Sequence, residues 1–362
     1  MKTTSFSFGM GSMVPKADDA ESARDWRSSI EDAFNSIPSV RDLVFTAVFG
    51  ETTLHRDGDV FVVPAVGEMS FRVTIPSRIQ EKLSLFPVPP TAIEEFDVTI
   101  VFGSFAPVTS VVCVGAEEDH FSPSTAVVVV REFLEAELGK LNGSNVTLST
   151  VGPSPFHVDF HVRPGVGEVE WRLGLSCTFK AGIGYRDCVF YYDPEVFSSV
   201  EEVMGGVLAH VRKELSGFYY LQIQRNHRMN VALDLNEEAE ALTYRLSEPG
   251  VRAFLRRTRG FRRALNSLKI AILKSRLMIA RHHREAQEII GITYLRLEVE
   301  LFRPYLDEVV AEKYEEELDA AEKIVDLLDE RQTHEAQRFV SFTVALIGVI
   351  VGSVLTAILR KL

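Results

Sequence analysis

Short apolar runs that are rich in β-branched and aromatic residues recur between residues 40 and 230, and turn-forming residues separate them. Several of these runs alternate apolar with polar positions, a spacing of two that is typical of strands with one buried face. The pattern predicts strands at 43–49, 60–66, 70–75, 96–102, 109–115, 145–151, 156–162, 168–179 and 187–192.

Two longer stretches between these strands carry helix-start signals. The stretch 122–141 begins with a serine N-cap followed by proline, and 193–215 begins in the same way with Asp193 and Pro194. The strands come in hairpin-like clusters and do not alternate strictly with helices. We therefore expect an α+β domain over 40–230, with a mixed or antiparallel sheet and helices on one face.

Beyond residue 230 the apolar positions change to helical spacing. Asn236 is a candidate N-cap, and Pro304 predicts a break or turn within the helical region. After Pro304, apolar or small residues follow an alternating step of three and four, which is the spacing of a heptad seam. These positions are Ala311, Tyr314, Leu318, Ala321, Val325 and Leu328. We expect a helical stalk over 236–338, turned near Pro304 into a hairpin and packed as a short coiled coil.

The stretch FVSFTVALIGVIVGSVLTAIL at 339–359 has no charge and no proline. Its polar side chains are hydroxyls, which can hydrogen-bond to their own helix and are tolerated in lipid. As a helix it would be about 30 Å long, which matches the hydrocarbon core of a bilayer. The stretch predicts one transmembrane helix, followed by a short tail at 360–362, in preference to a buried core helix.

The N-terminal and C-terminal segments predict the membrane topology of the protein and its self-association. Residues 1–39, which we expect to be a flexible N-terminal segment, lack the continuous apolar core of a secretory signal. We therefore expect a tail anchor with the N-terminal domain in the cytoplasm. Small side chains on one face of a membrane helix allow close approach of a second helix and predict self-association. These side chains are Ala345, Gly348, Gly352 and Thr356.

The amino-acid composition and net charge indicate which classes of molecule the protein can bind. The chain has 362 residues, of which 46% are hydrophobic and 25% charged, as in ordinary globular proteins. Its net charge of −12 argues against non-specific nucleic-acid binding by the whole molecule, because phosphate repels an acidic surface. Cys113, Cys177 and Cys188 are widely spaced in apolar runs, which predicts buried free thiols in a reducing compartment.

Charge is segregated along the helical region. Every charged residue between 249 and 284 is basic, whereas acidic residues dominate 307–330. The basic surface can pair with the acidic helix, in the same chain or in a neighbouring subunit, or it can contact anionic lipid headgroups. No specific nucleic-acid site is expected, because no pattern of interleaved aromatic residues and no known motif accompanies the arginines. The candidate residues are Arg256, Arg257, Arg259, Arg262 and Arg263.

Among the predicted strands, PFHVDFHV at 155–162 has the residues best suited to catalysis or metal binding. On a strand, His157, Asp159 and His161 share one face, and two imidazoles with a carboxylate suit a divalent metal. The acidic residues of EEDH at 117–120 could complete the coordination shell. The alternative is an ordinary solvated strand face. No phosphate-binding glycine loop or catalytic motif is present.

These features favour a membrane-anchored homo-oligomer that acts as a sensor, effector or scaffold. Its α+β domain would bind an unidentified ligand or protein partner, and the stalk would couple that event to the span. One alternative is an oligomeric ion-conducting channel or transporter. The order of a globular domain, long helices and a C-terminal membrane segment resembles CorA-type divalent-cation transporters, a resemblance of layout that carries over no residue. A second alternative is a tail-anchored, metal-dependent enzyme that uses the His157 face.

Overall fold

The computed structural model describes residues 3–15, 26–56, 59–83, 93–103, 105–113, 123–141, 146–153, 157–181, 186–247, 251–294, 300–312 and 314–359. It describes the backbone alone at 10–15, 49, 51–56, 59–63, 147–153, 172, 181, 246–247, 251–259, 335–336, 339, 350 and 352–359. The chain divides into two compact units. The sheet unit comprises Met1–Ile223 and Glu288–Asp307, and the helical unit comprises Gln224–Gln287 and Glu308–Leu362.

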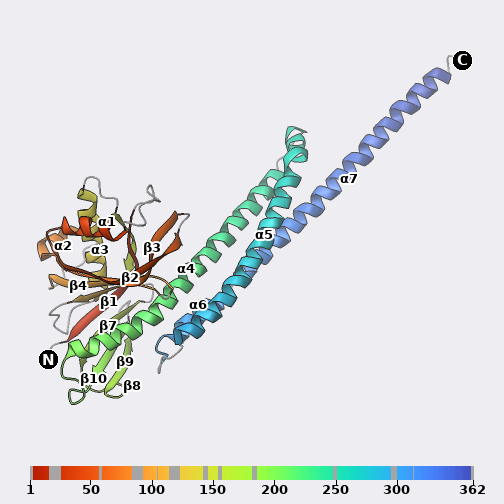
Figure 1. The fold of residues 1–362 in the computed structure, drawn as a ribbon. Coiled ribbons are helices and arrows are strands. Elements are labelled where there is room, and N and C mark those ends of the chain that lie inside the picture. Colours follow the sequence, from red (N-terminus) through yellow and green to blue (C-terminus); the bar gives the residue numbers. More distant parts are fainter. Residues whose placement is uncertain are drawn as a thin grey trace. The chain divides into compact units, whose positions relative to one another are not determined.

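The sheet unit is built on one mixed sheet, which the described residues form from ten strands (Figure 1). The strand order is β2-β3-β4-β5-β1-β7-β10-β9-β8, and β6 pairs with β1. Neighbouring strands are antiparallel apart from β7 and β10, which run parallel. This confirms the predicted α+β domain with a mixed sheet. The strands are β1 (Thr4–Pro15), β2 (Val40–Arg56), β3 (Asp59–Thr74), β4 (Glu95–Phe102), β5 (Val108–Cys113), β6 (Val146–Pro153), β7 (Val158–Pro164), β8 (Val169–Arg172), β9 (Leu175–Ala181) and β10 (Arg186–Tyr192).

The predicted strands all have counterparts in the sheet. The runs at 60–66 and 70–75 form the single strand β3, and the run at 168–179 divides into β8 and β9. Gly174 lies in the turn between them with a φ of 74°, a left-handed conformation that glycine adopts without strain.

The segment 1–39, for which the sequence predicts flexibility, instead supplies the central strand β1 and a helix. Phe6 and Phe8 face one side of the sheet and Ser5 and Ser7 face the other, and all four are buried. β1 pairs with β5 along one edge and with β7 and then β6 along the other. Because half of its side chains are small and polar, β1 gives a weak apolar signal although both of its faces are covered.

One face of the sheet is covered by α1 and α3, which enclose an apolar core with β3, β4 and β5 (Figure 1). The helices of this unit are α1 (Trp26–Asn35), α2 (Ser77–Leu83), α3 (Pro123–Lys140) and the first part of α4 (Val200–Ser247). Each fully buried aliphatic or aromatic side chain contributes about 1.5–3 kcal/mol, so this core is a main source of stability. It includes Ile30, Phe34, Met69, Phe71, Val73, Phe96, Val98, Ile100, Val111, Ala126, Val127, Val130, Phe133 and Leu134.

The opposite face of the sheet is aromatic and is covered by α4. The rings of Phe6 and Phe160 stack with centroids 5.1 Å apart, and Phe302 meets Phe160 edge-on at 6.1 Å. From α4, Arg212 donates to the hydroxyl of Ser110 on β5 at 2.7 Å. The prediction of helices on one face is therefore wrong. The central strands present apolar side chains on both faces, and each face requires a cover.

Helices α4 and α5 (Val251–Tyr294) approach closely within the sheet unit. A Cβ atom placed on Gly217 would lie 2.7 Å from the hydroxyl oxygen of Thr293, a distance that real Cβ contacts do not show. Both residues are buried, so the helices must separate to admit a larger side chain. Gly217 is thus required by the packing.

We predict that Gly217→Ala lowers the melting temperature of the protein, because the added methyl group pushes α4 away from Thr293. Gly205→Ala, on the same helix, is the matched control. A Cβ at Gly205 has nothing within 4 Å, and alanine is favoured over glycine in helices by about 1 kcal/mol. Calorimetry should show a loss for the first variant and no loss for the second. Equal behaviour of the two variants would contradict the close approach.

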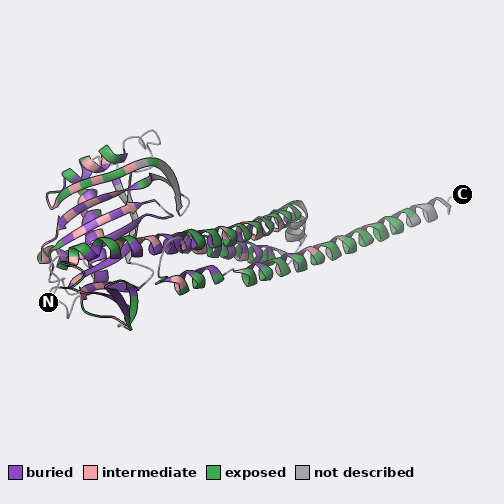
Figure 2. Cartoon of the chain, turned by 60° about the horizontal axis from the view of Figure 1, so that its bottom comes forward, coloured by how far each residue is buried: buried purple, intermediate pink, exposed green. Residues whose placement is uncertain are grey.

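The helical unit contains the rest of α4, most of α5, the end of α6 (Arg303–Ala311) and α7 (Glu315–Leu359). Figure 2 shows buried and exposed residues interspersed along α4 and α5, as in an amphipathic bundle. The prediction of a C-terminal helical region is confirmed, with Pro304 in the first turn of α6. The three long helices share an apolar core of Leu235, Ala239, Leu242, Phe261, Leu265, Leu268, Ile272, Ile279, Leu318, Ala321, Val325 and Leu328.

Two boundaries within this region differ from the predicted ones. α4 runs through Asn236 without a break, because its neighbours Leu235 and Ala239 continue the apolar core. α6 ends at Ala311 and Tyr314 has a φ of 56°, so the predicted heptad run is interrupted before α7 begins. The interruption is stabilised from α4, where Arg228 donates to the main-chain carbonyls of Val309 and Glu312.

No helix that the described residues form is long and apolar enough to cross a membrane. This finding overturns the expectation of a tail-anchored, single-pass membrane protein with a cytoplasmic N-terminal domain. The bilayer as a partner and the ion-conducting alternative both require such a span.

Candidate functional site

The three residues of the predicted metal site have different surroundings in the structure. His157 precedes β7 with a φ of 50° and an exposed side chain, and its carbonyl accepts the backbone N–H of Arg186. Asp159 and His161 lie on β7 and share the sheet face that α3 covers. The positive φ at His157 ends the strand alternation that would have placed the three side chains on one face.

Asp159 is buried and caps the start of α3. Its carboxylate accepts the backbone N–H of Ser124 at 2.8 Å and the hydroxyl of Ser124 at 3.3 Å. A carboxylate at a helix N-terminus is stabilised by the unpaired N–H groups and by the helix dipole. Asp159 therefore has a structural role in joining α3 to the sheet.

His161 lies between Ser5 on β1 and Asp187 on β10. Its Nδ1 is 2.9 Å from the hydroxyl of Ser5, and its Nε2 is 3.8 Å from a carboxylate oxygen of Asp187. These residue types occur in nucleophilic serine sites, but Ser5 is buried and 3.8 Å is too long for a hydrogen bond. The arrangement is a polar row across three strands.

Within the described parts of the chain, no group of three or more His, Cys, Asp or Glu side chains is arranged to hold a metal ion. The acidic cluster at 117–120 lies outside those parts. A divalent metal at His157, Asp159 and His161 stays a prediction from the sequence.

A second polar cluster, in the sheet unit, centres on Glu214 of α4. This carboxylate has no exposed surface, yet four donors satisfy it. On the same helix, His210 lies with its Nε2 2.8 Å from the carboxylate. The hydroxyl of Tyr294 donates at 2.8 Å, and the backbone N–H groups of Leu301 and Phe302 donate at 3.2 and 2.7 Å.

The surroundings of Glu214 indicate that it holds separate segments of the chain together. His210 packs against Trp171 with ring centroids 4.7 Å apart, and the guanidinium of Arg303 lies 5.1 Å from the ring of Tyr294. Burial and the nearby charge of Glu214 raise the pKa of Tyr294 well above its ordinary value, so the phenol stays a neutral donor. His210, Glu214 and Tyr294 are all buried, so a substrate has no access to this acid–base set. The cluster joins α4, the end of α5 and residues 301–302.

We predict that Glu214→Gln lowers the free energy of unfolding by about 2–3 kcal/mol, because an amide cannot accept from four donors and its NH2 would face N–H groups. Glu238→Gln, at an exposed position of the same helix, is the control and should change little. Urea denaturation provides the measurement. An unchanged midpoint for Glu214→Gln would show that the buried carboxylate does not hold these segments together.

The three cysteines are free and buried, as the sequence predicts. Burial raises the pKa of Cys113 and Cys188 well above the ordinary thiol value, and it raises the pKa of Cys177 from 9.0 to about 11. Thiols that are buried and protonated are poor nucleophiles and poor metal ligands. The cysteines are therefore part of the core.

We predict that the protein loses stability as pH rises from 9 towards 11. The folded state holds the thiol proton of Cys177 up to a pKa of about 11, whereas the unfolded chain releases it near 9.0. The contribution is complete below pH 9 and is lost as pH passes through the folded pKa. Cys177→Ala should lose stability less steeply over this range in urea denaturation. Parallel pH dependences for the two proteins would contradict the assignment.

The helical unit carries an apolar stripe on the outside of α5, formed by Ile270, Leu273 and Leu277. Their spacing of three and four places them on one face, away from the core residues Leu268 and Ile272. The stripe residues are 55%, 60% and 65% exposed, respectively. Single exposed apolar residues are ordinary, but an aligned row on an amphipathic helix is typical of an interaction surface.

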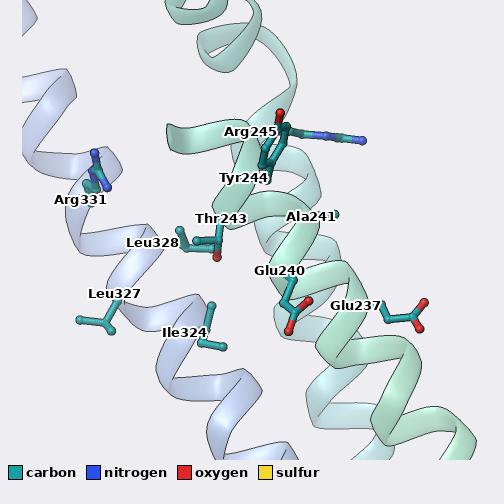
Figure 3. Close-up of a pocket in the computed structure, with 10 residues that line it drawn as sticks. All are labelled: Glu237, Glu240, Ala241, Thr243, Tyr244, Arg245, Ile324, Leu327, Leu328 and Arg331. Atoms are coloured by element: carbon teal, nitrogen blue, oxygen red, sulfur yellow. The ribbon is translucent and has the colours of Figure 1, made fainter. Parts of the chain in front are cut away.

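A groove lies between the C-terminal part of α4 and α7 (Figure 3). Its volume is about 1050 Å³. Leu328 is buried in the core, whereas Tyr244 is 70% and Leu327 is 66% exposed. The lining residues are Glu237, Glu240, Ala241, Thr243, Tyr244, Arg245, Ile324, Leu327, Leu328 and Arg331. The described residues of the helical unit thus form an apolar stripe and a groove outside its core.

Ion pairs join α5 to α7 within the chain. Lys269 lies 2.6 Å from Asp329, and Arg276 lies 2.5 Å from Asp319. The α7 partner moves towards lower numbers as the α5 residue moves towards higher ones, so the two helices are antiparallel. Of the interpretations drawn from charge segregation, pairing of the basic and acidic helices is therefore found in the same chain.

The predicted basic surface is described only in part. The side chains of Arg262 and Arg263 are exposed on α5. The side chains of Arg256, Arg257 and Arg259 lie outside the described ones, as do those of Gly352 and Thr356 in the small-residue stripe.

Comparison of this chain with protein-family models, with curated proteins and with solved structures finds no match.

Sequence reasoning missed the Glu214 cluster and the α5 stripe. A histidine and a glutamate four residues apart in an apolar helix were a signal for the first, although the partners from 294–302 are distant in sequence. For the second, Ile270, Leu273 and Leu277 form an additional apolar row beside the core row of the same helix. No local pattern marks the groove, because two helices far apart in sequence form it.

Proposed function

We propose that this protein is a homo-oligomeric scaffold that assembles through its helical unit and presents its sheet unit to a ligand or protein partner. The observation that carries the proposal is the exposed α5 stripe of Ile270, Leu273 and Leu277. A helix of a monomeric bundle normally has polar residues on its outer face. Covering this stripe with another copy removes apolar surface from water, which favours association.

Further apolar surface on α7 supports assembly. Ala345 and Gly348, two residues of the predicted self-association stripe, are exposed, and a Cβ placed on Gly348 would have nothing within 4 Å. A second helix can approach closely at such small residues. The apolar side chains around them are at least half exposed and comprise Val340, Phe342, Val344, Leu346, Ile347, Val349 and Val351.

We predict that the full chain has a mass that is a multiple of 40.5 kDa by light scattering coupled to size-exclusion chromatography. Leu273→Glu combined with Leu277→Glu should shift the mass towards a single chain, because two carboxylates cannot be buried in an apolar contact without a large cost. Leu173→Glu, at an exposed apolar residue in the turn between β8 and β9, is the control and should keep the wild-type mass.

A single-chain mass for the wild type at every concentration tested would refute the proposed assembly. A wild-type mass for the double variant would show that the α5 stripe does not contribute to it.

A further inference from the structure

We infer that copies of this chain meet stripe to groove: the α5 stripe of one copy docks into the α4–α7 groove of another. This inference rests on the proposed function and specifies its contact. The occupant of the groove is a second copy because the chain itself carries a helix face that matches the groove in length, apolar character and charge.

The stripe and the groove have matching lengths. From Ile270 to Leu277 an α-helix rises about 10 Å, and from Ile324 to Arg331 α7 rises by the same amount. A channel between two neighbouring helices accepts the side-chain ridge of a third helix, which is the usual mode of helix packing. The stripe therefore fits the groove as a ridge of one and a half to two turns.

Apolar side chains meet in this arrangement. The stripe has two leucines and an isoleucine, and the middle of the groove is lined by Ile324, Leu327, Leu328 and Ala241. Tyr244 at the edge has a ring that can cover the docked helix. Burial of these exposed side chains contributes about 25 cal/mol per Å² of apolar surface removed from water.

Charge gives the docked helix a direction. Glu237 and Glu240 lie on the α4 rim towards the end of the groove where Ile324 lies. Lys274 flanks the stripe towards the C-terminal end of α5, and Arg281, one turn further on, is paired with Glu285 at 2.6 Å. An α5 helix that runs antiparallel to α4 brings Lys274 to the glutamates.

The same direction suits the other end of the groove, where Arg245 and Arg331 lie. The first α5 residue to reach this end along the stripe is Asn266, which is uncharged, and Arg263 lies one turn beyond it. The reverse direction would bring Lys274 closer to Arg245 and Arg331, and like charges repel. Antiparallel docking is therefore favoured.

The basic flanks also disfavour contact between two stripes. Two α5 helices packed face to face would place Arg263, Lys274 and Arg284 of one copy near the same residues of the other. Stripe-to-groove contact avoids this repulsion. Because the stripe and the groove lie on the same chain, the contact either closes reciprocally in a dimer or repeats around a ring.

Disulfide cross-linking between two tagged chains tests this contact. One chain carries Leu273→Cys and the other carries Leu327→Cys, and the two are co-expressed and oxidised. We predict a cross-linked pair of the two different chains, because the two positions face each other across the contact and disulfides require Cβ atoms about 4 Å apart. Leu273→Cys with Leu173→Cys is the control pair and should not cross-link. The native thiols are buried and do not compete.

The outcomes separate this inference from the proposed function. A multiple-chain mass with no cross-link between positions 273 and 327, or with a dominant cross-link between two copies of position 273, would refute stripe-to-groove contact and leave assembly intact. A single-chain mass would refute both.

Charge exchange provides an independent readout. Glu237→Lys with Glu240→Lys should weaken association about fivefold, since two attractive contacts become repulsive. Adding Lys274→Glu should restore part of the loss. If Lys274→Glu weakens association further in that background, the proposed direction is wrong.

Discussion

A carboxylate with no exposed surface, that of Glu214, determines how the chain returns to the sheet. A buried charge is tolerated only when donors replace its lost water, and here they come from α4 itself, from the end of α5 and from the backbone at 301–302. Phe302 is thereby held against Phe160 on the aromatic face of the sheet. The close approach of α4 and α5 at Gly217 and Thr293 depends on the same return of the chain to the sheet unit.

The helical unit has a different constraint. Three helices can bury one inward row each, and the core from Leu235 to Leu328 accounts for those rows. Ion pairs such as Lys269–Asp329 hold α5 along α7 and leave the outer face of α5 to water. The apolar stripe on that face and the groove between α4 and α7 remain after the core has formed. In the proposed assembly, copies of the chain cover both with surfaces that the chain already has.

The sheet unit shows why chemistry was harder to predict than fold. The alternation of apolar and polar residues in strands such as β4 and β7 is a local property of the sequence, so the sequence predicted these strands. Serines in β1 hid a central strand, and the positive φ at His157 displaced one residue of a face that alternation had seemed to define. Asp159 has a role that only the position of α3 explains.

The helical half shows the same limit. Heptad spacing predicted the row from Leu318 to Leu328, but the break at Tyr314 depends on Arg228 of a distant helix. The apolar composition of 339–359 predicted a membrane span that the described residues do not provide. The length and apolar character of a helix can be read from its own stretch of sequence, whereas what surrounds the helix cannot. The contacts of Glu214 with residues 294–302 were beyond prediction for that reason.

Amide hydrogen exchange across residues 262–284, measured at high and low protein concentration, tests the claim that the helical unit is an assembly surface. Coverage of α5 by another copy should slow exchange around Ile270 to Leu277 as concentration rises, while residues 203–215 in the sheet unit keep the same rate. Exchange in α5 that does not depend on concentration would contradict the account.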